Sequence, residues 1–339
     1  MAVEKRYTRR LAPALGLLLL SPWVGEFLLG SSPIQNLLAA VALLVPLYGG
    51  GALLIREIAR RTGRGWPTIL LLGAAYGVIE AGLLDQSLFN PDFLGPEIAD
   101  DTRIPLLGIS ASNAISYVAG HAIWSIALPI AVAEMLTPSG SRRPWLGRTG
   151  LIAAAALYLA GCAIVFSFIY ADTRFIASPA QRIGAAATAI VLIAAAFAAG
   201  GKRGRARPIA RGKAWNPWLL GIGSFVVASM FAAHPENWAG VALGVVLLAS
   251  AWALVRYGAA RGGWNDRHRF SLIAGALLTC AWLGFAVTLL VRPTDTVAWF
   301  GNGLFALMAV GLLLWIAHTL RRTVKKDSTI ANGGISHEA

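Results

Sequence analysis

Long apolar stretches separated by short polar segments dominate the pattern of hydrophobic and polar positions along this chain. An α-helix of roughly 20 apolar residues crosses the hydrocarbon core of a membrane, which is about 30 Å thick. Membrane-spanning β-strands are shorter and alternate polar with apolar positions, so long unbroken stretches indicate helices. Stretches of this kind lie near residues 11–30, 37–55, 67–88, 112–136, 149–170, 183–200, 217–233, 238–256, 271–291 and 297–319. The pattern therefore predicts an all-α, polytopic integral membrane protein with about ten transmembrane helices.

Composition and charge agree with a lipid solvent. The chain is 57% hydrophobic and 13% charged, with a mean hydropathy of +0.64. This composition excludes a water-soluble globular protein. All but four of its 29 Lys and Arg residues fall on one side of the predicted membrane, and the four exceptions are Arg103, Arg174, Arg182 and Arg292. The positive-inside rule places the basic side in the cytoplasm. We therefore expect a cell-membrane protein with both termini cytoplasmic.

The same charge pattern bears on partners. A net charge of +13 is explained by contact with the headgroups of the lipid bilayer, which is the first expected partner. No polar segment is long enough to form the basic face of a soluble module, so no nucleic-acid partner is expected.

A polar and basic stretch divides the chain unevenly. We predict a six-helix membrane region at 1–200, which carries the intramembrane polar residues, and a basic cytoplasmic linker at 201–216. A four-helix membrane region then follows at 217–320. The tail at 321–339 has too little apolar content to bury, so it is expected to be disordered in the cytoplasm.

Polar residues inside the apolar stretches are the main pointers to function, and they concentrate in the first four stretches. The candidate substrate- or proton-binding residues are Glu26, Tyr76, Glu80, Asn113, Tyr117 and His121. Tyr76 and Glu80 share one helical face, and the last three recur at four-residue spacing along another. At 1.5 Å of rise per residue, Glu26, Glu80 and His121 lie at roughly 7, 12 and 13 Å from the outer boundary. An ionisable group in hydrocarbon is costly, so these three are expected to face one another or a wet cavity.

The second apolar stretch contains a predicted helix interruption. Pro46 removes a backbone hydrogen bond, and Tyr48 and the glycines at 49–51 follow it. Such a helix either lines a cavity or contains a simple packing kink, and both interpretations stay open here.

Structural roles account for several other residues. Gly73 and Gly77, four residues apart, favour close approach of neighbouring helices. Glu57 and Glu134 lie near basic ends of their stretches, where ion pairs with arginines are expected. The two cysteines lie inside predicted helices, so no disulfide or thiolate metal site is expected.

One constellation resembles a known family. Glu80, together with His121 and the aromatic Tyr117 four residues before it, resembles the glutamate and aromatic-x-x-x-His elements of CAAX-type intramembrane proteases. The resemblance covers two stretches. It implies a metal-dependent intramembrane hydrolase with Glu80 as general base and His121 as a metal ligand or acid/base group. The chain departs from that pattern, because Ala81 stands in place of a second glutamate and Leu84 in place of an arginine, and no suitable later histidine is evident.

We interpret the chain as a transporter or solute-binding membrane protein with an outward-facing polar cavity. Glu26, Glu80 and His121 would surround this cavity, bind an unknown small solute or ion, and exchange protons with it. The alternatives are the protease-like hydrolase and a non-catalytic membrane scaffold. No cofactor motif is found, and no residue is assigned as a metal ligand or as catalytic.

Overall fold

The computed structural model describes residues 2–93, 101–137, 143–199 and 210–333. The α-helices are α1 (Ala2–Pro22), α2 (Leu37–Leu44), α3 (Gly50–Arg61), α4 (Trp66–Ile79), α5 (Ala111–Gly120), α6 (Leu128–Met135), α7 (Arg148–Thr173), α8 (Pro179–Ala199), α9 (Pro217–Ala232), α10 (Trp238–Gly258), α11 (Asp266–Val291) and α12 (Thr296–Gly333). A 3-10 turn, η2 (Ile34–Asn36), precedes α2, and four π-helical segments continue or join α-helices. These are η1 (Trp23–Leu28), η3 (Val45–Gly49), η4 (Glu80–Leu84) and η5 (His121–Ala127).

The described helices confirm the all-α polytopic architecture. Nine helical spans in the described ranges are long and apolar enough to cross a membrane, and α9 is a shorter apolar helix. At 16 residues, α9 is about 24 Å long, somewhat less than the hydrocarbon core. The ten predicted stretches thus correspond to nine full spans and one shorter helix.

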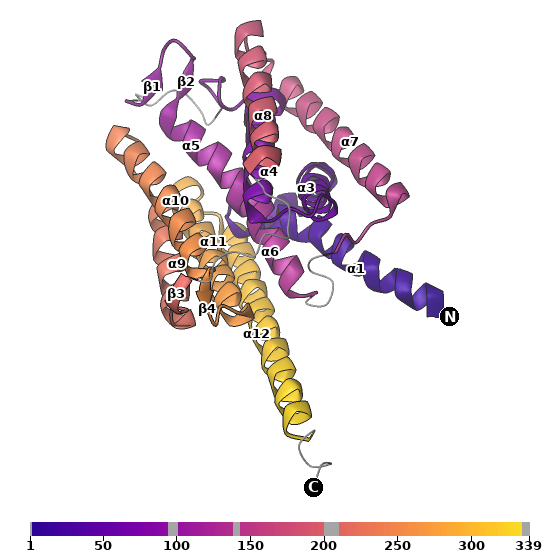
Figure 1. The fold of residues 1–339 in the computed structure, drawn as a ribbon. Helices are drawn as coiled ribbons and strands as arrows, with labels where there is room; N and C mark the ends of the chain where they lie inside the picture. Colours follow the sequence, from indigo (N-terminus) through magenta and orange to yellow (C-terminus); the bar gives the residue numbers. More distant parts are fainter. Residues whose placement is uncertain (1, 94–100, 138–142, 200–209, 334–339) are drawn as a thin grey trace.

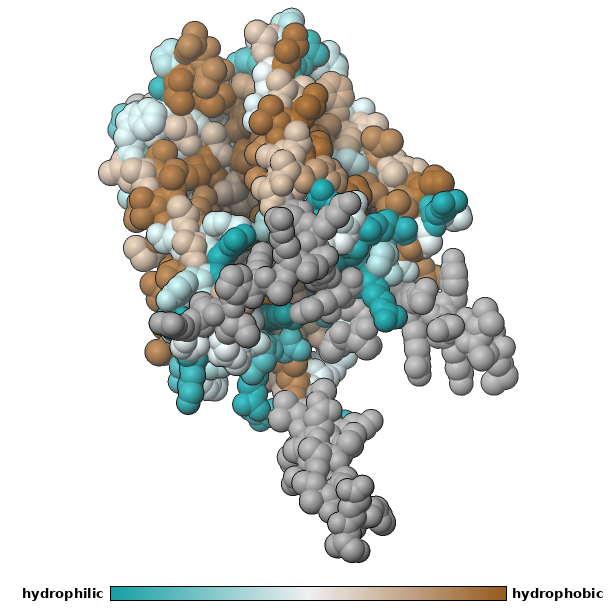
Figure 2. Space-filling view, viewed as in Figure 1, coloured by the Kyte–Doolittle hydropathy of each residue, from teal (hydrophilic) through white to brown (hydrophobic). Residues whose placement is uncertain are grey.

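Helices α9 to α12 lie together on one side of the molecule (Figure 1). They contact the first part of the chain where α10 meets α5, where α11 meets α6 and η1, and where α12 meets η1 and η2. The start of α1 and the end of α12 lie toward the same end of the molecule. Hydrophobic side chains cover most of the face seen in Figure 2, and hydrophilic ones gather toward that end. This distribution is typical of a protein whose solvent is lipid.

Two short strand pairs lie at opposite ends of the molecule (Figure 1). The strand β1 (Arg103–Ile104) pairs antiparallel with β2 (Ile109–Ser110) just before α5 begins. Near the end of α10, β3 (Ala210–Lys213) pairs in parallel with β4 (Arg261–Gly262).

The predicted linker and tail are only partly described. Residues 200–209 and 334–339 lie outside the described residues. The rest of the linker contains β3, and α12 continues to Gly333, well into the stretch that we expected to be disordered.

Close helix packing at Gly73 and Gly77 is confirmed. A methyl group added at Gly73 would lie 3.1 Å from the Cα of Ala122, and one at Gly77 would lie 2.9 Å from the carbonyl oxygen of Val118. The backbone of α4 therefore rests directly on α5 and η5. This contact decides which faces of α4 and α5 meet.

A buried ionic network ties the basic ends of the helices together. Glu57 is fully buried, and its carboxylate pairs with Arg56 at 2.6 Å. It also accepts backbone N–H bonds from Trp145 at 2.8 Å and from Leu146 at 3.2 Å. The guanidinium of Arg56 lies 3.3 Å from the centre of the Trp145 ring. The expected ion pairs are thus present, and they hold the segment before α7 against α3.

Glu134 completes the network from α6. Its two carboxylate oxygens accept from the Nε and Nη2 atoms of Arg60 at 2.7 and 2.6 Å, a two-point contact that fixes geometry. Arg56 Nε adds a third bond to Glu134 at 3.2 Å. Helices α3 and α6 are therefore locked to each other at this end.

We predict that Glu57→Gln lowers the free energy of unfolding by about 3 kcal/mol, because removing one member of a buried pair leaves a charge without compensation. The measurement is thermal unfolding of the purified protein in detergent, followed by intrinsic fluorescence. The matched control is Asp266→Asn, which removes a carboxylate paired with Arg269 at 3.0 Å at an exposed position. This control should cost less than about 1 kcal/mol. Equal losses in the two variants would contradict the role given to the buried network.

Candidate functional site

Each of the four π-helical segments contributes a side chain to one polar network in the membrane interior. Glu26 lies in η1 and Tyr48 in η3, while Glu80 begins η4 and His121 begins η5. The backbone amide of Asp85 donates to the carbonyl of Glu80 at 3.0 Å, the five-residue spacing of a π-turn. Such turns occupy well under 1% of residues in proteins and occur frequently at functional sites. Their coincidence with these side chains marks this layer as the candidate site.

The hydroxyl of Tyr48 is the centre of the site. It donates to Glu26 Oε1 at 2.6 Å, and it lies 3.1 Å from Glu80 Oε1 and 3.2 Å from His121 Nε2. A phenol carries one proton, so it donates to one carboxylate at a time. Its contact with the other carboxyl group then requires a proton on that carboxyl. The geometry therefore favours an extra proton shared between Glu26 and Glu80.

The imidazole of His121 faces the carboxyl group of Glu80. Its Nδ1 lies 2.6 Å from the carbonyl oxygen of Tyr117, and because a carbonyl only accepts, Nδ1 carries a hydrogen. Its Nε2 is in direct contact with Glu80 Oε2. One proton must lie between these two atoms, either on the imidazole or on the carboxyl. The pair can therefore change which group holds the proton with little movement of heavy atoms.

Aromatic rings enclose this network. The ring of Tyr76 lies 6.0 Å from that of Tyr48 and 6.1 Å from that of His121, measured between centroids. Tyr76 is only 3% exposed, and its hydroxyl is buried without a hydrogen-bond partner among the described residues. Buried hydroxyl groups normally have partners. The Tyr76 hydroxyl therefore has unused hydrogen-bonding capacity beside the network.

The structure brings together four of the six predicted residues: Glu26, Tyr76, Glu80 and His121. Tyr117 contributes its backbone carbonyl, as described above. Asn113 lies in the first turn of α5, two helical turns before His121, and its backbone N–H donates to Ser110 Oγ at 3.2 Å. It is therefore separate from the network.

Tyr48 is the residue that sequence reasoning missed as a site member. Its signal was present, because a hydroxyl-bearing side chain follows Pro46 in the predicted helix interruption. The interruption itself takes the form of η3, and α3 continues directly from it at Gly50. The second span is thus a continuous helix that contains a π-helical segment, and it is not broken.

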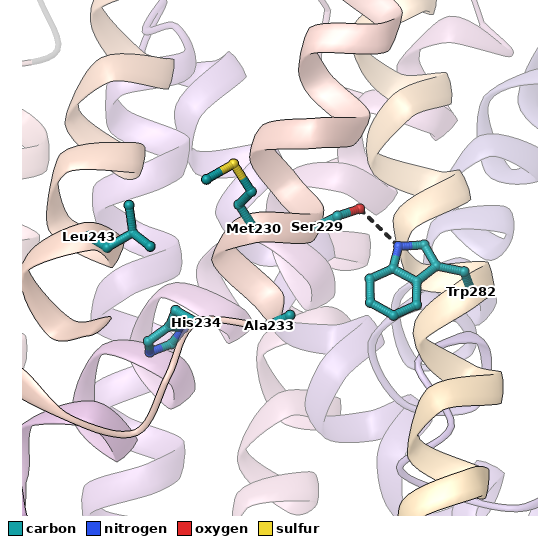
Figure 3. A pocket seen from close by; sticks show the side chains of 6 residues that line it. All are labelled: Ser229, Met230, Ala233, His234, Leu243 and Trp282. Atoms are coloured by element: carbon teal, nitrogen blue, oxygen red, sulfur yellow. Dashed lines mark hydrogen bonds between the residues drawn. The ribbon is translucent and has the colours of Figure 1, made fainter. Parts of the chain in front are cut away.

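The network is more enclosed than the expected outward-facing cavity. Glu80 is 5% exposed and the side chain of His121 is 16% exposed. A hollow of about 400 Å³ lies among α9, α10 and α11, and none of the network residues lines it. Figure 3 shows this hollow, in which Trp282 Nε1 donates to Ser229 Oγ at 2.8 Å. Of its six lining residues only His234 carries an ionisable side chain, so the hollow is less suited to proton chemistry than the network.

Metal binding by the same groups depends on the number of ligands they can supply. Zinc sites use three or four protein ligands. Within the described ranges of the chain, no group of three or more His, Cys, Asp and Glu side chains is arranged to hold a metal ion. The hydroxyl of Tyr48 occupies the place between the carboxyl groups.

A family model of uncharacterized membrane proteins matches residues 15–333. The chain belongs to this uncharacterized membrane protein family. Neither the curated proteins nor the solved structures contained a match to the chain. The matched range covers every residue of the network, so the site lies within the part shared with this membrane protein family.

We predict that Tyr48→Phe lowers the free energy of unfolding by about 1–3 kcal/mol, because it leaves buried acceptors without their shared donor. The variant should also shift the infrared carbonyl band of the carboxyl groups, which loses its hydrogen-bonded component. The control is Tyr170→Phe, since Tyr170 is 36% exposed and lies far along α7. An unchanged infrared band in Tyr48→Phe would show that the phenol does not bridge the two glutamates.

Proposed function

We propose that this protein is a proton-exchanging transporter or solute-binding protein, with Glu26, Tyr48, Glu80 and His121 as its exchange site. The observation that carries the proposal is the sharing of one phenolic hydroxyl by two carboxyl groups and an imidazole inside a membrane. Ionisable groups at such depth are costly and mark ion or proton pathways. A structural network would need only one stable protonation state, whereas this arrangement has several of similar geometry.

The chemistry of the site indicates what it exchanges. When Glu26, Glu80 and His121 together hold two exchangeable protons, their net charge is zero. They can hold at most one proton more. A bound cationic solute would replace a proton at Glu26 or Glu80 and keep the buried charge low. Tyr76, with its buried hydroxyl, supplies a further polar contact next to this place.

The π-helical segments give the site a way to open. A π-turn can shift along a helix by small changes in hydrogen bonding, because its backbone groups already deviate from the α-helical ladder. Helices that carry irregular turns line the substrate sites of many transporters. In the described state the first and fourth spans are held together, since Ser21 Oγ donates to the carbonyl of Ser125 at 2.6 Å. Separation at this contact would expose Glu26.

We further propose that the protein lies in the cell membrane with both termini in the cytoplasm. The position of the start of α1 and the end of α12 at one end of the molecule supports an even number of crossings (Figure 1). The concentration of basic residues on that side supports its assignment to the cytoplasm. The exchange site then lies nearer the outer surface.

A hydrolase is the second candidate. The observation in its favour is the direct contact of the Glu80 carboxyl group with the His121 imidazole, a pair suited to general acid and base catalysis. A metal-dependent form of that reaction would need further ligands from groups that are engaged with Tyr48. Transport chemistry makes use of all four groups, so we favour it.

We predict that proton movement across the membrane depends on Glu80. The purified protein is reconstituted in liposomes loaded with a pH-sensitive dye, and gradients of Na⁺, K⁺, Mg²⁺, amino acids and sugars are applied in turn. At least one gradient should change the internal pH with wild-type protein. Glu80→Gln and Glu26→Gln should reduce this change to that of empty liposomes, while Arg322→Gln should preserve it. Equal responses of Glu80→Gln and the wild type would refute the proposed site.

Elemental analysis separates the two candidate functions. We expect less than about half an equivalent of zinc per gently purified chain, because zinc sites normally use three or four protein ligands. Near-stoichiometric zinc that is lost in His121→Ala would reject the transport proposal in favour of the hydrolase.

We predict that the polar segments between the first and second spans, between α7 and α8, and between α11 and α12 face outward. In a variant that lacks the native cysteines, single cysteines at Ser32, Asp172 and Asp295 should react with an impermeant thiol reagent in intact cells. Cysteines at Arg267 and Arg322 should react only after the cells are opened. The reverse pattern would invert the orientation.

A further inference from the structure

A large crevice lies on the side of α4 and α5 that faces away from the polar network. This crevice, of about 1780 Å³, runs between α4, α5 and α8 on one wall and α10 and α11 on the other. Ala122, which follows His121 directly, lines this crevice, whereas His121 faces the polar network. Thr188 of α8 is exposed, and Trp252 of α10 is 37% exposed, so the crevice opens sideways between these two helices.

The walls of the crevice are apolar over most of their length. Side chains such as Leu70, Val78, Ile115, Val118 and Leu248 line it. Its volume exceeds the range of about 300–1,000 Å³ that is usual for sites of small ligands. These properties suit a long apolar chain and not a compact polar solute.

One end of the crevice is basic and aromatic. Its lining includes the arginines Arg60, Arg143, Arg256 and Arg269, the acids Glu134 and Asp266, and the tryptophans Trp66, Trp252 and Trp264. Glu134 is paired with Arg60 at 2.6 Å, and Asp266 is paired with Arg269 at 3.0 Å. Both acids therefore already face an arginine, and Arg143 and Arg256 leave this end with a net positive charge.

The aromatic residues place this end at the level of lipid headgroups. Tryptophan is enriched where a membrane protein passes from hydrocarbon to water. The guanidinium of Arg256 lies 5.3 Å from the centre of the Trp252 ring, which holds the charge beside the opening. Basic pockets between transmembrane helices attract anionic headgroups.

We propose that the crevice binds a membrane phospholipid with an anionic headgroup. The acyl chains lie along the apolar walls of α4, α5 and α10, and the phosphate contacts Arg143 and Arg256. The site is separate from the proton-exchange network and does not depend on the function proposed for it. The bound lipid fills the space between the two groups of helices and holds α10 against the first part of the chain.

The test is native mass spectrometry of the delipidated full chain in detergent. Phosphatidylglycerol and phosphatidylcholine with identical acyl chains are titrated in parallel. The wild type should bind phosphatidylglycerol about tenfold more tightly, as expected for two basic residues that act on one anionic headgroup. Arg143→Gln combined with Arg256→Gln should remove this preference. The matched control, Arg321→Gln combined with Arg322→Gln, removes equal charge outside the crevice and should leave it intact.

A filling variant tests the apolar walls independently of charge. Ala251 lines the crevice from α10, and Ala251→Trp should weaken binding of both lipids at least fivefold without changing thermal unfolding of the lipid-free protein. Inorganic phosphate added at the lipid concentration should not displace phosphatidylglycerol.

Four results would overturn the proposal. These are equal affinity for the two lipids in the wild type, equal loss of the preference in the control pair, displacement of the lipid by free phosphate, and a dimer that excludes lipid. A dimer of that kind would assign the crevice to a second copy of the chain.

Discussion

One hydroxyl group contacts two carboxyl groups and an imidazole in the interior of this membrane protein. Tyr48 lies 2.6 Å from Glu26 and 3.1 Å from Glu80, and it also contacts His121. Without such a partner each of these groups would have to be buried in hydrocarbon at a cost of several kcal/mol. The first four spans therefore meet where their polar residues are, and their helices deform into π-turns to bring the side chains together.

The second span connects this network to the ionic network at its basic end. Tyr48 and Arg56 are two helical turns apart on the same continuous span. Arg56 and Glu57 are locked by Glu134 and by the backbone before α7. A change of protonation near Tyr48 thus acts on a helix that is anchored at one end. Under the proposed function, movement is expected at the other end of this span.

The helix pair α4 and α5 separates two environments. Gly73 and Gly77 let the two backbones touch, which turns Glu80 and His121 toward the polar network. The opposite faces of the same helices line the apolar crevice, with Val78 and Ala122 among its walls. One face therefore carries the polar network, and the other lines the apolar crevice. A membrane-embedded site benefits from this separation, because a dry apolar wall keeps bulk water away from the buried carboxyl groups.

Residue depth alone predicted part of the site. Helical rise placed Glu26, Glu80 and His121 in one layer, and the structure places them in contact through Tyr48. Depth cannot tell which residue stands between them, because that depends on the rotation of each helix about its axis. The same limit explains Asn113, which shares a stripe with His121 along α5 but lies two turns away from the network.

The sequence by itself determined the solvent, the helical class and the approximate spans, because hydrophobic length and the satisfaction of backbone hydrogen bonds in lipid are local properties. Local glycine spacing also indicated that the third span packs closely against a neighbouring helix. Only the tertiary structure decided that Tyr48 bridges the glutamates and that Glu57 is fully buried beneath Trp145. It alone revealed the crevice lined by residues from Arg60 to Ile273. Each of these depends on how separate helices rotate and pack, and residues far apart in sequence meet only when those rotations are set together.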